Sequence, residues 1–118
     1  TDIITIAVST PCFILPAELL QFNVRLNGTK AVVSWISKEE GITGYEIERS
    51  YDGIQFTTAG FQPATGVNGQ NASYSFTDPV DVSGKVYYRL KLIKIAQSEN
   101  KYSNILSVAM HTDQKLEI

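Results

Sequence analysis

Residue types that could carry out chemistry are scarce in this 118-residue chain. His111 is its single histidine, which excludes a histidine-based catalytic triad and a multi-histidine metal site built from one chain. Cys12 is its single cysteine, so no disulfide can form within the chain. We interpret His111 as a surface residue of a tail. Cys12 is interpreted as a buried or linker thiol, and the alternative is a disulfide to a preceding domain.

Carboxylate pairs offer the other candidate chemistry. Glu46 and Glu48 alternate along a predicted strand, which places both carboxylates on one face, roughly 7 Å apart. Glycosidases use two carboxylates about 5–9 Å apart in a cleft. Arg49 lies beside this pair and the face is predicted to contact water, so a solvated strand surface is the preferred interpretation. We therefore predict that the chain is not an enzyme and needs no cofactor or metal. A small acidic hydrolase is the weakest alternative.

The elements that would position these residues show a clear alternation. Residues 87–95 alternate polar and apolar side chains, a polar turn follows, and the alternation resumes over 102–108. This pattern predicts two antiparallel strands with one dry face and one wet face. The sequence therefore predicts an all-β fold, a seven-stranded antiparallel immunoglobulin-like Greek-key β-sandwich. Its other strands are expected at 20–26, 31–35, 45–50, 54–56 and 73–77.

The residues between these segments predict how the strands connect. Asn27-Gly28 and Asp52-Gly53 each predict a two-residue hairpin turn, because these residue types tolerate positive φ. Residues 61–71 predict a long polar loop, and residues 78–84 predict a turn-rich crossing. The adjacent apolar residues Leu92-Ile93 break the alternation, so a bulge or a strand end is expected there.

Large aromatic residues recur at the positions predicted to face inward. Burial of each would contribute roughly 1.5–3 kcal/mol to stability. On this pattern Leu20 begins the inward face of the first strand, and Phe56 and Tyr74 also point inward. The residues expected to form the structural core are Trp35, Tyr45, Tyr88, Leu90 and Phe76.

Composition and proline positions divide the chain into three segments. Residues 1–15 are expected to be an extra N-terminal strand or the tail of a preceding domain, plus a linker. Residues 16–110 are expected to form the sandwich, and 111–118 a C-terminal tail. A hydrophobic fraction of 43% suits a core that needs neither metal nor disulfide. The first residue is Thr rather than Met, so we expect a processed or excised piece of a longer precursor.

Several short motifs, taken in order, resemble those of a fibronectin type III domain. Trp35 is similar to the tryptophan of the second strand of that family, and Tyr45 to the aromatic residue that opens the third. Residues 88–92 resemble the sixth strand, and residues 102–104 the start of the seventh. The resemblance implies that Tyr88 is a corner tyrosine whose hydroxyl bonds back to the preceding connection, with Tyr87 as the alternative.

The resemblance is closer to one subgroup of that family. Residues 15–22, 33–35, 44–50 and 87–91 are similar to the sandwich modules near the C-terminus of secreted Bacteroidetes-type surface proteins. This resemblance implies an extracellular or cell-surface location in a bacterium. It also implies a noncatalytic spacer, adhesion or protein-interaction module of a larger protein. The alternative function is a carbohydrate-binding module attached to a secreted enzyme, because sugars stack on aromatic rings.

Charge and hydropathy limit the partners. A net charge of −2 and a pI of about 5.3 disfavour nucleic acid, and no apolar run approaches roughly 20 residues, so no membrane insertion is expected. The expected partners are neighbouring domains, with another protein or a glycan as further candidates. Recognition is expected on loops at the ends of the sandwich. The candidate ligand-contacting residues are Glu39, Glu40, Phe61, Gln62 and Asn68.

Overall fold

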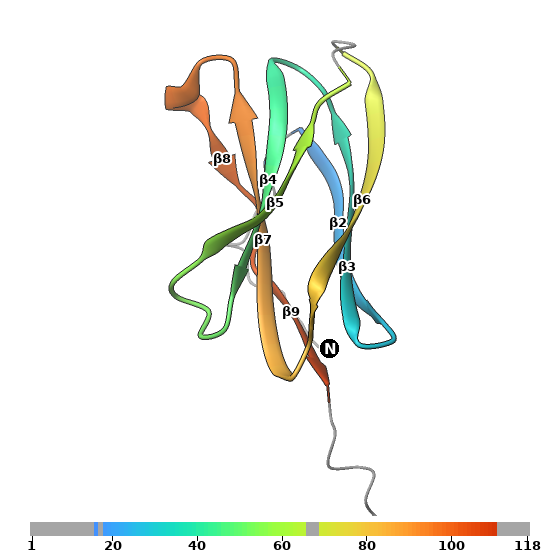
Figure 1. The fold of residues 1–118 in the computed structure, drawn as a ribbon. Helices are drawn as coiled ribbons and strands as arrows, with labels where there is room; N and C mark the ends of the chain where they lie inside the picture. The colour runs from blue at the N-terminus through green and yellow to red at the C-terminus, as the bar shows by residue number, and fades with distance from the viewer. Residues whose placement is uncertain (1–15, 17, 66–68, 111–118) are drawn as a thin grey trace, which may run out of the picture.

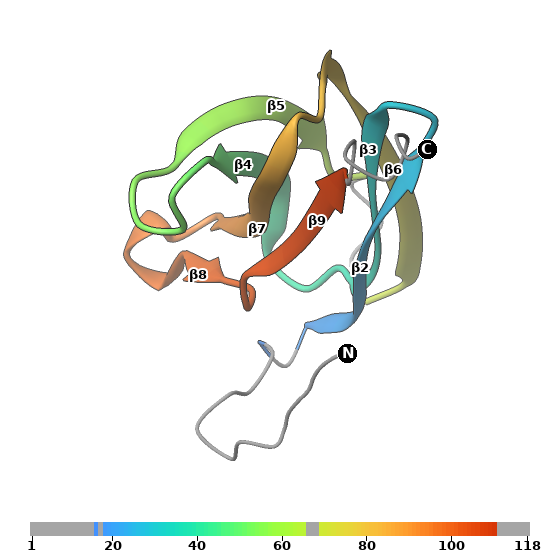
Figure 2. The same cartoon turned by 90° about the horizontal axis from the view of Figure 1, so that it is seen from below.

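The protein is a β-sandwich. The computed structural model describes residues 16, 18–65 and 69–110. Two antiparallel sheets lie face to face (Figure 1), and the view along the strands separates the two layers (Figure 2). The elements are β2 (Leu19–Asn27), β3 (Lys30–Lys38), β4 (Ile42–Ser50), β5 (Thr57–Pro63), β6 (Asn71–Asp81), β7 (Gly84–Lys94), the 3₁₀ helix η1 (Gln97–Glu99), β8 (Lys101–Tyr102) and β9 (Leu106–Met110).

The sheets differ in size. The smaller sheet has the strand order β2-β3-β6, and the larger has the order β5-β4-β7-β8, with β9 also paired to β7. The strand predicted at 102–108 is therefore divided into β8 and β9. Ser103 causes the break, because its hydroxyl accepts a hydrogen bond from the Leu90 N–H at 2.8 Å. The Ser103 N–H in turn donates to the Leu90 carbonyl at 2.9 Å.

Aromatic rings fill the space between the sheets. Trp35 is 2% exposed, and its ring centroid lies 5.4 Å from those of Tyr45 and Tyr74. Phe76 is partly buried and its ring covers Gly60, where a Cβ would lie 2.4 Å from the Phe76 Cε1. The remaining fully buried apolar residues include Val33, Ile47, Val86, Tyr88, Leu90 and Leu92.

Two of the residues predicted to face inward do not. Leu19 is buried and Leu20 is 49% exposed, because the pairing of β2 with β3 shifts register between Leu19 and Gln21. The extra residue in this bulge turns Leu20 outward. Phe56 lies outside the core, because its ring packs on the guanidinium of Arg89, 4.1 Å from the ring centroid.

Strand boundaries also differ from the prediction. The segment 54–56 is not a strand but part of a six-residue connection, 51–56. The strand that follows, β5, begins at Thr57 and ends at Pro63, so it includes the first residues of the predicted loop. The Asp52 carboxylate organises this connection, because it accepts hydrogen bonds from the N–H groups of Ile54 and Gln55. The predicted loop at 61–71 is correspondingly shorter, and the second turn is not a two-residue hairpin.

β6 continues beyond its predicted end. It runs to Asp81 and includes Pro79, so the crossing to β7 consists of Val82 and Ser83. Proline is tolerated because β6 lies at the edge of its sheet and its pairing with β3 shifts register between Lys30 and Val32.

The bulge predicted in β7 lies instead on its neighbour β4. The pairing of β4 with β7 shifts register between Ile42 and Gly44. β7 itself keeps alternating, so Leu92 faces the core, Ile93 faces outward and Lys94 occupies the next inward position. Lys94 therefore occupies an inward position of β7, where the alternation predicts an apolar side chain.

Some predicted features lie outside the described residues. These are the strand and Cys12 expected in 1–15, Asn68, and the tail that contains His111. In the described ranges no helix has the length and apolar character needed to cross a membrane.

Candidate functional site

A buried glutamate holds one end of the sandwich together. Glu39 follows β3 directly and is 2% exposed. Its carboxylate accepts hydrogen bonds from the Tyr45 hydroxyl at 2.8 Å, from the Tyr74 hydroxyl, and from the Thr65 hydroxyl at 2.6 Å. The Thr65 N–H donates to the same carboxylate at 3.1 Å. This Glu39 cluster, comprising Glu39, Tyr45, Thr65 and Tyr74, joins both sheets to the loop after β5.

The hydrogen bonds decide the charge of the Glu39 cluster. Burial raises the pKa of Glu39, but donation from Thr65, Tyr74 and Tyr45 outweighs it and leaves the pKa below its usual 4.5. Burial, followed by the nearby Glu39 carboxylate, raises the pKa of Tyr74 to about 12. The same causes raise the pKa of Tyr45. The tyrosines therefore remain hydrogen-bond donors, and Glu39 remains a carboxylate at neutral pH.

Acid is expected to destabilise the domain through this cluster. Because the folded pKa of Glu39 lies below its unfolded value of 4.5, its contribution to stability is present above that value and is lost as pH falls through the folded pKa. We expect a melting temperature that is steady down to about pH 5 and falls below about pH 4.5. Calorimetry across pH measures it, and Glu39→Gln should flatten the fall.

The matched control is Glu99→Gln, which changes an exposed glutamate on η1. It should keep the acid profile of the parent protein. Full acid dependence in Glu39→Gln would show that the cluster does not carry the effect, and would leave the other carboxylates with a lowered pKa, Glu18, Asp52, Asp78 and Asp81, as its sources.

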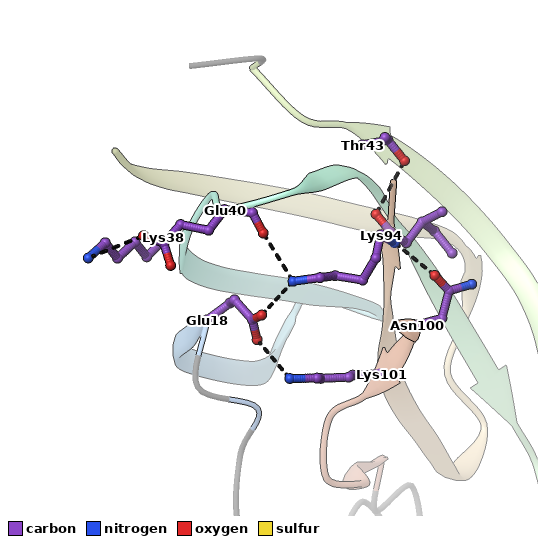
Figure 3. Close-up of polar contacts among 8 residues, drawn as sticks. Glu18, Lys38, Glu40, Thr43, Lys94, Asn100 and Lys101 are labelled. Carbon is purple, nitrogen blue, oxygen red and sulfur yellow. Dashed lines mark hydrogen bonds and ion pairs between the residues drawn. The ribbon is translucent and has the colours of Figure 1, made fainter. Parts of the chain in front are cut away.

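A buried ion pair lies where the chain enters β2. The Lys94 Nζ contacts the Glu18 Oε2 at 2.5 Å and the Glu40 carbonyl oxygen at 3.0 Å, while the Lys101 Nζ lies 3.6 Å from the Glu18 Oε1 (Figure 3). The side chains of Glu18 and Lys94 are 12% and 9% exposed. Burial alone would raise the pKa of Glu18. The hydrogen bond and positive charge of Lys94, together with the charge of Lys101, outweigh this effect, so the pKa lies below its usual value of 4.5.

A second buried ion pair joins the two sheets. Asp78 on β6 is fully buried and accepts two hydrogen bonds from Arg49 on β4, at 2.7 Å from Nε and 2.8 Å from Nη2. The Tyr88 hydroxyl donates to the same carboxylate at 2.6 Å. The hydroxyl of Tyr88, the predicted corner tyrosine, thus donates its hydrogen bond to the side chain of Asp78 on β6, ten positions earlier, rather than to the connection before β7. Burial raises the pKa of Asp78, but Arg49 and Tyr88 together hold it below its usual value.

The outer face of the larger sheet carries a row of exposed and half-buried side chains. Phe61 on β5 pairs with Glu46 on β4, Glu46 pairs with Lys91 on β7, and Lys91 pairs with Tyr102 on β8. Directly paired residues project to the same face of a sheet. The four residues Phe61, Glu46, Lys91 and Tyr102, called here the outer row, therefore cross the whole sheet. Phe61 and Tyr102 are 53% and 46% exposed.

An arginine supports one end of the outer row. The Arg89 guanidinium lies 4.1 Å from the Phe56 ring centroid and 4.2 Å from that of Tyr102. Its Nε donates to the Glu48 carboxylate at 2.7 Å. Glu48 is consequently only 8% exposed, which corrects the expectation of a solvated carboxylate on this strand.

The candidate ligand residues do not form one site. Glu39 is buried in its cluster, which corrects its assignment to a surface loop. Glu40 is exposed, and its carbonyl oxygen accepts from Lys94. Phe61 and Gln62 lie on β5 rather than in a loop, with Phe61 on the outer face. Asn68 is outside the described residues.

The sequence interpretation overlooked two important residues. Lys94 continues the inward alternation of β7, and that two-residue period could have identified it as buried. Asp78 precedes a proline and was therefore assigned to a turn. No local signal indicates its burial, because its partner Arg49 lies 29 residues away.

No metal centre is evident in the part of the chain that the structure describes. There, no group of three or more His, Cys, Asp and Glu side chains is placed to hold a metal ion. The outer face of the larger sheet instead carries exposed aromatic rings beside charged groups that can form hydrogen bonds, and such a face can bind a ligand.

Comparison with known proteins gives one informative likeness. No family model matches this chain, and no curated protein matches it. Among solved structures, the crystal structure of β-1,2-glucanase from Parabacteroides distasonis is similar, with 25% sequence identity and a TM-score of 0.55. The match covers 85% of this chain and 15% of that chain, so this chain spans a small part of the solved protein.

This likeness corrects one prediction. We predicted that the chain is not an enzyme, whereas the solved chain that shares its fold is an enzyme. The matched segment is 15% of that enzyme, so the catalytic activity is stated for the whole glucanase. What the comparison establishes for this chain is similarity in all-β fold to one segment of a glucan-degrading protein.

Proposed function

We propose that this chain is a β-sandwich module of a larger bacterial glycan-degrading enzyme that acts outside the cell or at its surface. The observation that carries the proposal is the coverage of the structural match, 85% of this chain against 15% of the glucanase chain. A fold that accounts for a small share of a long enzyme and has its own core is the usual form of a domain within a multidomain chain. The expected partners are the neighbouring domains.

The sequence motifs support a fibronectin type III-like module. In the order of the described strands Trp35 lies on the second strand, β3, and Tyr45 on the third, β4. Tyr88 lies on the sixth, β7, where the family resemblance expects the corner tyrosine. The sheets β2-β3-β6 and β5-β4-β7-β8 keep the strands in two antiparallel layers, as that resemblance requires.

The buried ion pair at the chain entry supports a spacer role. The Leu19 N–H donates to the Pro16 carbonyl at 2.9 Å, and the Lys38 N–H donates to the Glu18 carbonyl at 2.8 Å. Lys94 holds the Glu18 side chain at the same point. A domain joined ahead of Pro16 would therefore be attached to a fixed point of the sandwich, and its direction would be constrained.

A second candidate function is carbohydrate binding by the module itself. The observation that favours it is the outer row, where Phe61 and Tyr102 expose aromatic rings on one face beside Glu46 and Lys91. Aromatic rings with adjacent polar groups are suited to sugars, which present both C–H faces and hydroxyl groups.

The proposal is tested on the intact parent protein. The complete reading frame that contains this segment is expressed, and the purified product is assayed for release of reducing sugar from a panel of linear glucans of differing β-linkage. We expect hydrolysis of at least one glucan. A parent protein that is folded but cleaves no polysaccharide of the panel would refute its assignment to a glycan-degrading enzyme.

A further inference from the structure

We propose that the outer row, Phe61, Glu46, Lys91 and Tyr102, is a binding surface for a linear oligosaccharide. This inference rests on the proposed function, because it assigns a glycan surface to a module of a glycan-degrading enzyme. The four residues are consecutive partners in the pairing of β5, β4, β7 and β8. These strands are neighbours in the larger sheet (Figure 1). Their side chains therefore lie on one face and form one continuous line.

The length of the outer row matches a chain of sugars rather than one sugar. Adjacent strands are about 4.8 Å apart, so three strand spacings place the backbone of Phe61 and that of Tyr102 roughly 14 Å apart. A single pyranose ring cannot contact both aromatic residues at that separation. An oligosaccharide lying across the strands can contact both, and its middle units then lie over Glu46 and Lys91.

The aromatic ends of the outer row are held in place. The tip of the Phe61 ring lies over Gly44, where a Cβ would be 2.3 Å from the Phe61 Cζ. Glycine at this position therefore lets the ring approach the sheet backbone. Arg89 contacts one side of the Tyr102 ring and is itself fixed by Glu48. Restrained aromatic side chains lose little conformational entropy when a ligand binds.

The polar centre of the outer row suits hydroxyl groups. Glu46 and Lys91 face each other across β4 and β7 but form no ion pair, and the contact of Glu46 with the Thr58 hydroxyl is long, at 3.4 Å. A carboxylate accepts hydrogen bonds from hydroxyls and an ammonium donates to them, so the two groups can bind a polyol without breaking a salt bridge.

The same composition disfavours other occupants. A stable protein interface has few charged residues at its centre, yet Glu46 and Lys91 occupy the centre of this face. Nucleic acid would require a basic stripe, whereas this row carries one carboxylate for each ammonium. A neutral glycan is compatible with both charges and both rings.

The test is isothermal titration of the 118-residue chain with linear gluco-oligosaccharides of differing β-linkage and of increasing length. We expect affinity to rise with length until the ligand spans the outer row. Phe61→Ala should weaken binding of the longer ligands by about tenfold. Tyr102→Ala should weaken it similarly and remove the dependence on length. Glu46→Ala should lower the affinity for every oligosaccharide that reaches the polar centre of the outer row, whatever its length.

The matched control is Ile54→Ala, which removes an 81% exposed apolar side chain from the connection between β4 and β5 and should leave binding unchanged. Circular dichroism establishes that each variant is folded. Absence of binding to every oligosaccharide, or equal binding by Phe61→Ala and the parent chain, would overturn the inference. Hydrolysis of glucan by the parent enzyme in that case would leave the proposed function intact, so the two failures are distinguishable.

Discussion

Replacing Trp35 with alanine is expected to cost about 3–5 kcal/mol, enough to unfold most of the protein. The indole is 2% exposed and packs against Tyr45 and Tyr74, whose own ring centroids are 5.1 Å apart. Its removal leaves a cavity bordered by rings that are fixed by hydrogen bonds to Glu39, so the surrounding core cannot collapse to fill it. Urea denaturation followed by circular dichroism measures the change.

Two further variants make this result specific. Ile54→Ala alters an exposed side chain and should change stability by less than about 0.5 kcal/mol. Trp35→Phe should cost less than Trp35→Ala, because it keeps an aromatic ring and removes an indole N–H that has no hydrogen-bond partner among the described residues. Near-native stability of Trp35→Ala would contradict the central position of this residue in the core.

Replacing Asp78 with alanine is the second change expected to have a large effect, about 3–5 kcal/mol. Asp78 is fully buried and neutralises Arg49, whose side chain is 15% exposed. Without the carboxylate, the largely buried guanidinium loses its ion-pair partner, and the Tyr88 hydroxyl loses its acceptor. The midpoint of chemical denaturation at neutral pH measures the loss.

Asp81 provides the matched control for Asp78. Both residues lie on β6 and both form ion pairs, but Asp81 pairs with Lys30 at the surface, where its side chain is 67% exposed. Solvent screens that pair, so Asp81→Ala should destabilise much less. Tyr88→Phe should give an intermediate loss of about 1.5–3 kcal/mol, because it removes one hydrogen bond to the carboxylate and keeps Arg49. Equal losses for Asp78→Ala and Asp81→Ala would contradict the role of burial.

The pattern of side chains was sufficient to predict the strands that have one dry face. In β7 the apolar residues alternate from Val86 to Leu92, and this period of two determines both the strand and its orientation. The prediction failed where register shifts, as at Leu20, because one extra residue in a bulge reverses which side chains face inward. It also failed at Pro79, where the edge position of β6 makes a proline compatible with a strand.

The candidate site was less predictable than the fold. Phe61 was singled out, but as a loop residue rather than as a member of a sheet face. The outer row consists of residues from four strands, and its members are separated by as many as 56 positions in the sequence, the distance from Glu46 to Tyr102. Their alignment depends on the pairing register of three strand pairs, which no local pattern encodes.

Antiparallel strands around a core of aromatic and branched residues were predictable from the sequence, because alternation and residue type are local properties. Which charges are buried and which side chains share a face depends on contacts that form only when the chain folds. Glu39, Asp78 and Lys94 carry charged side chains, a type that is usually exposed to water, yet all three are buried. They are stable inside because donors and opposite charges from distant strands compensate the loss of hydration, and those partners meet only in the folded chain.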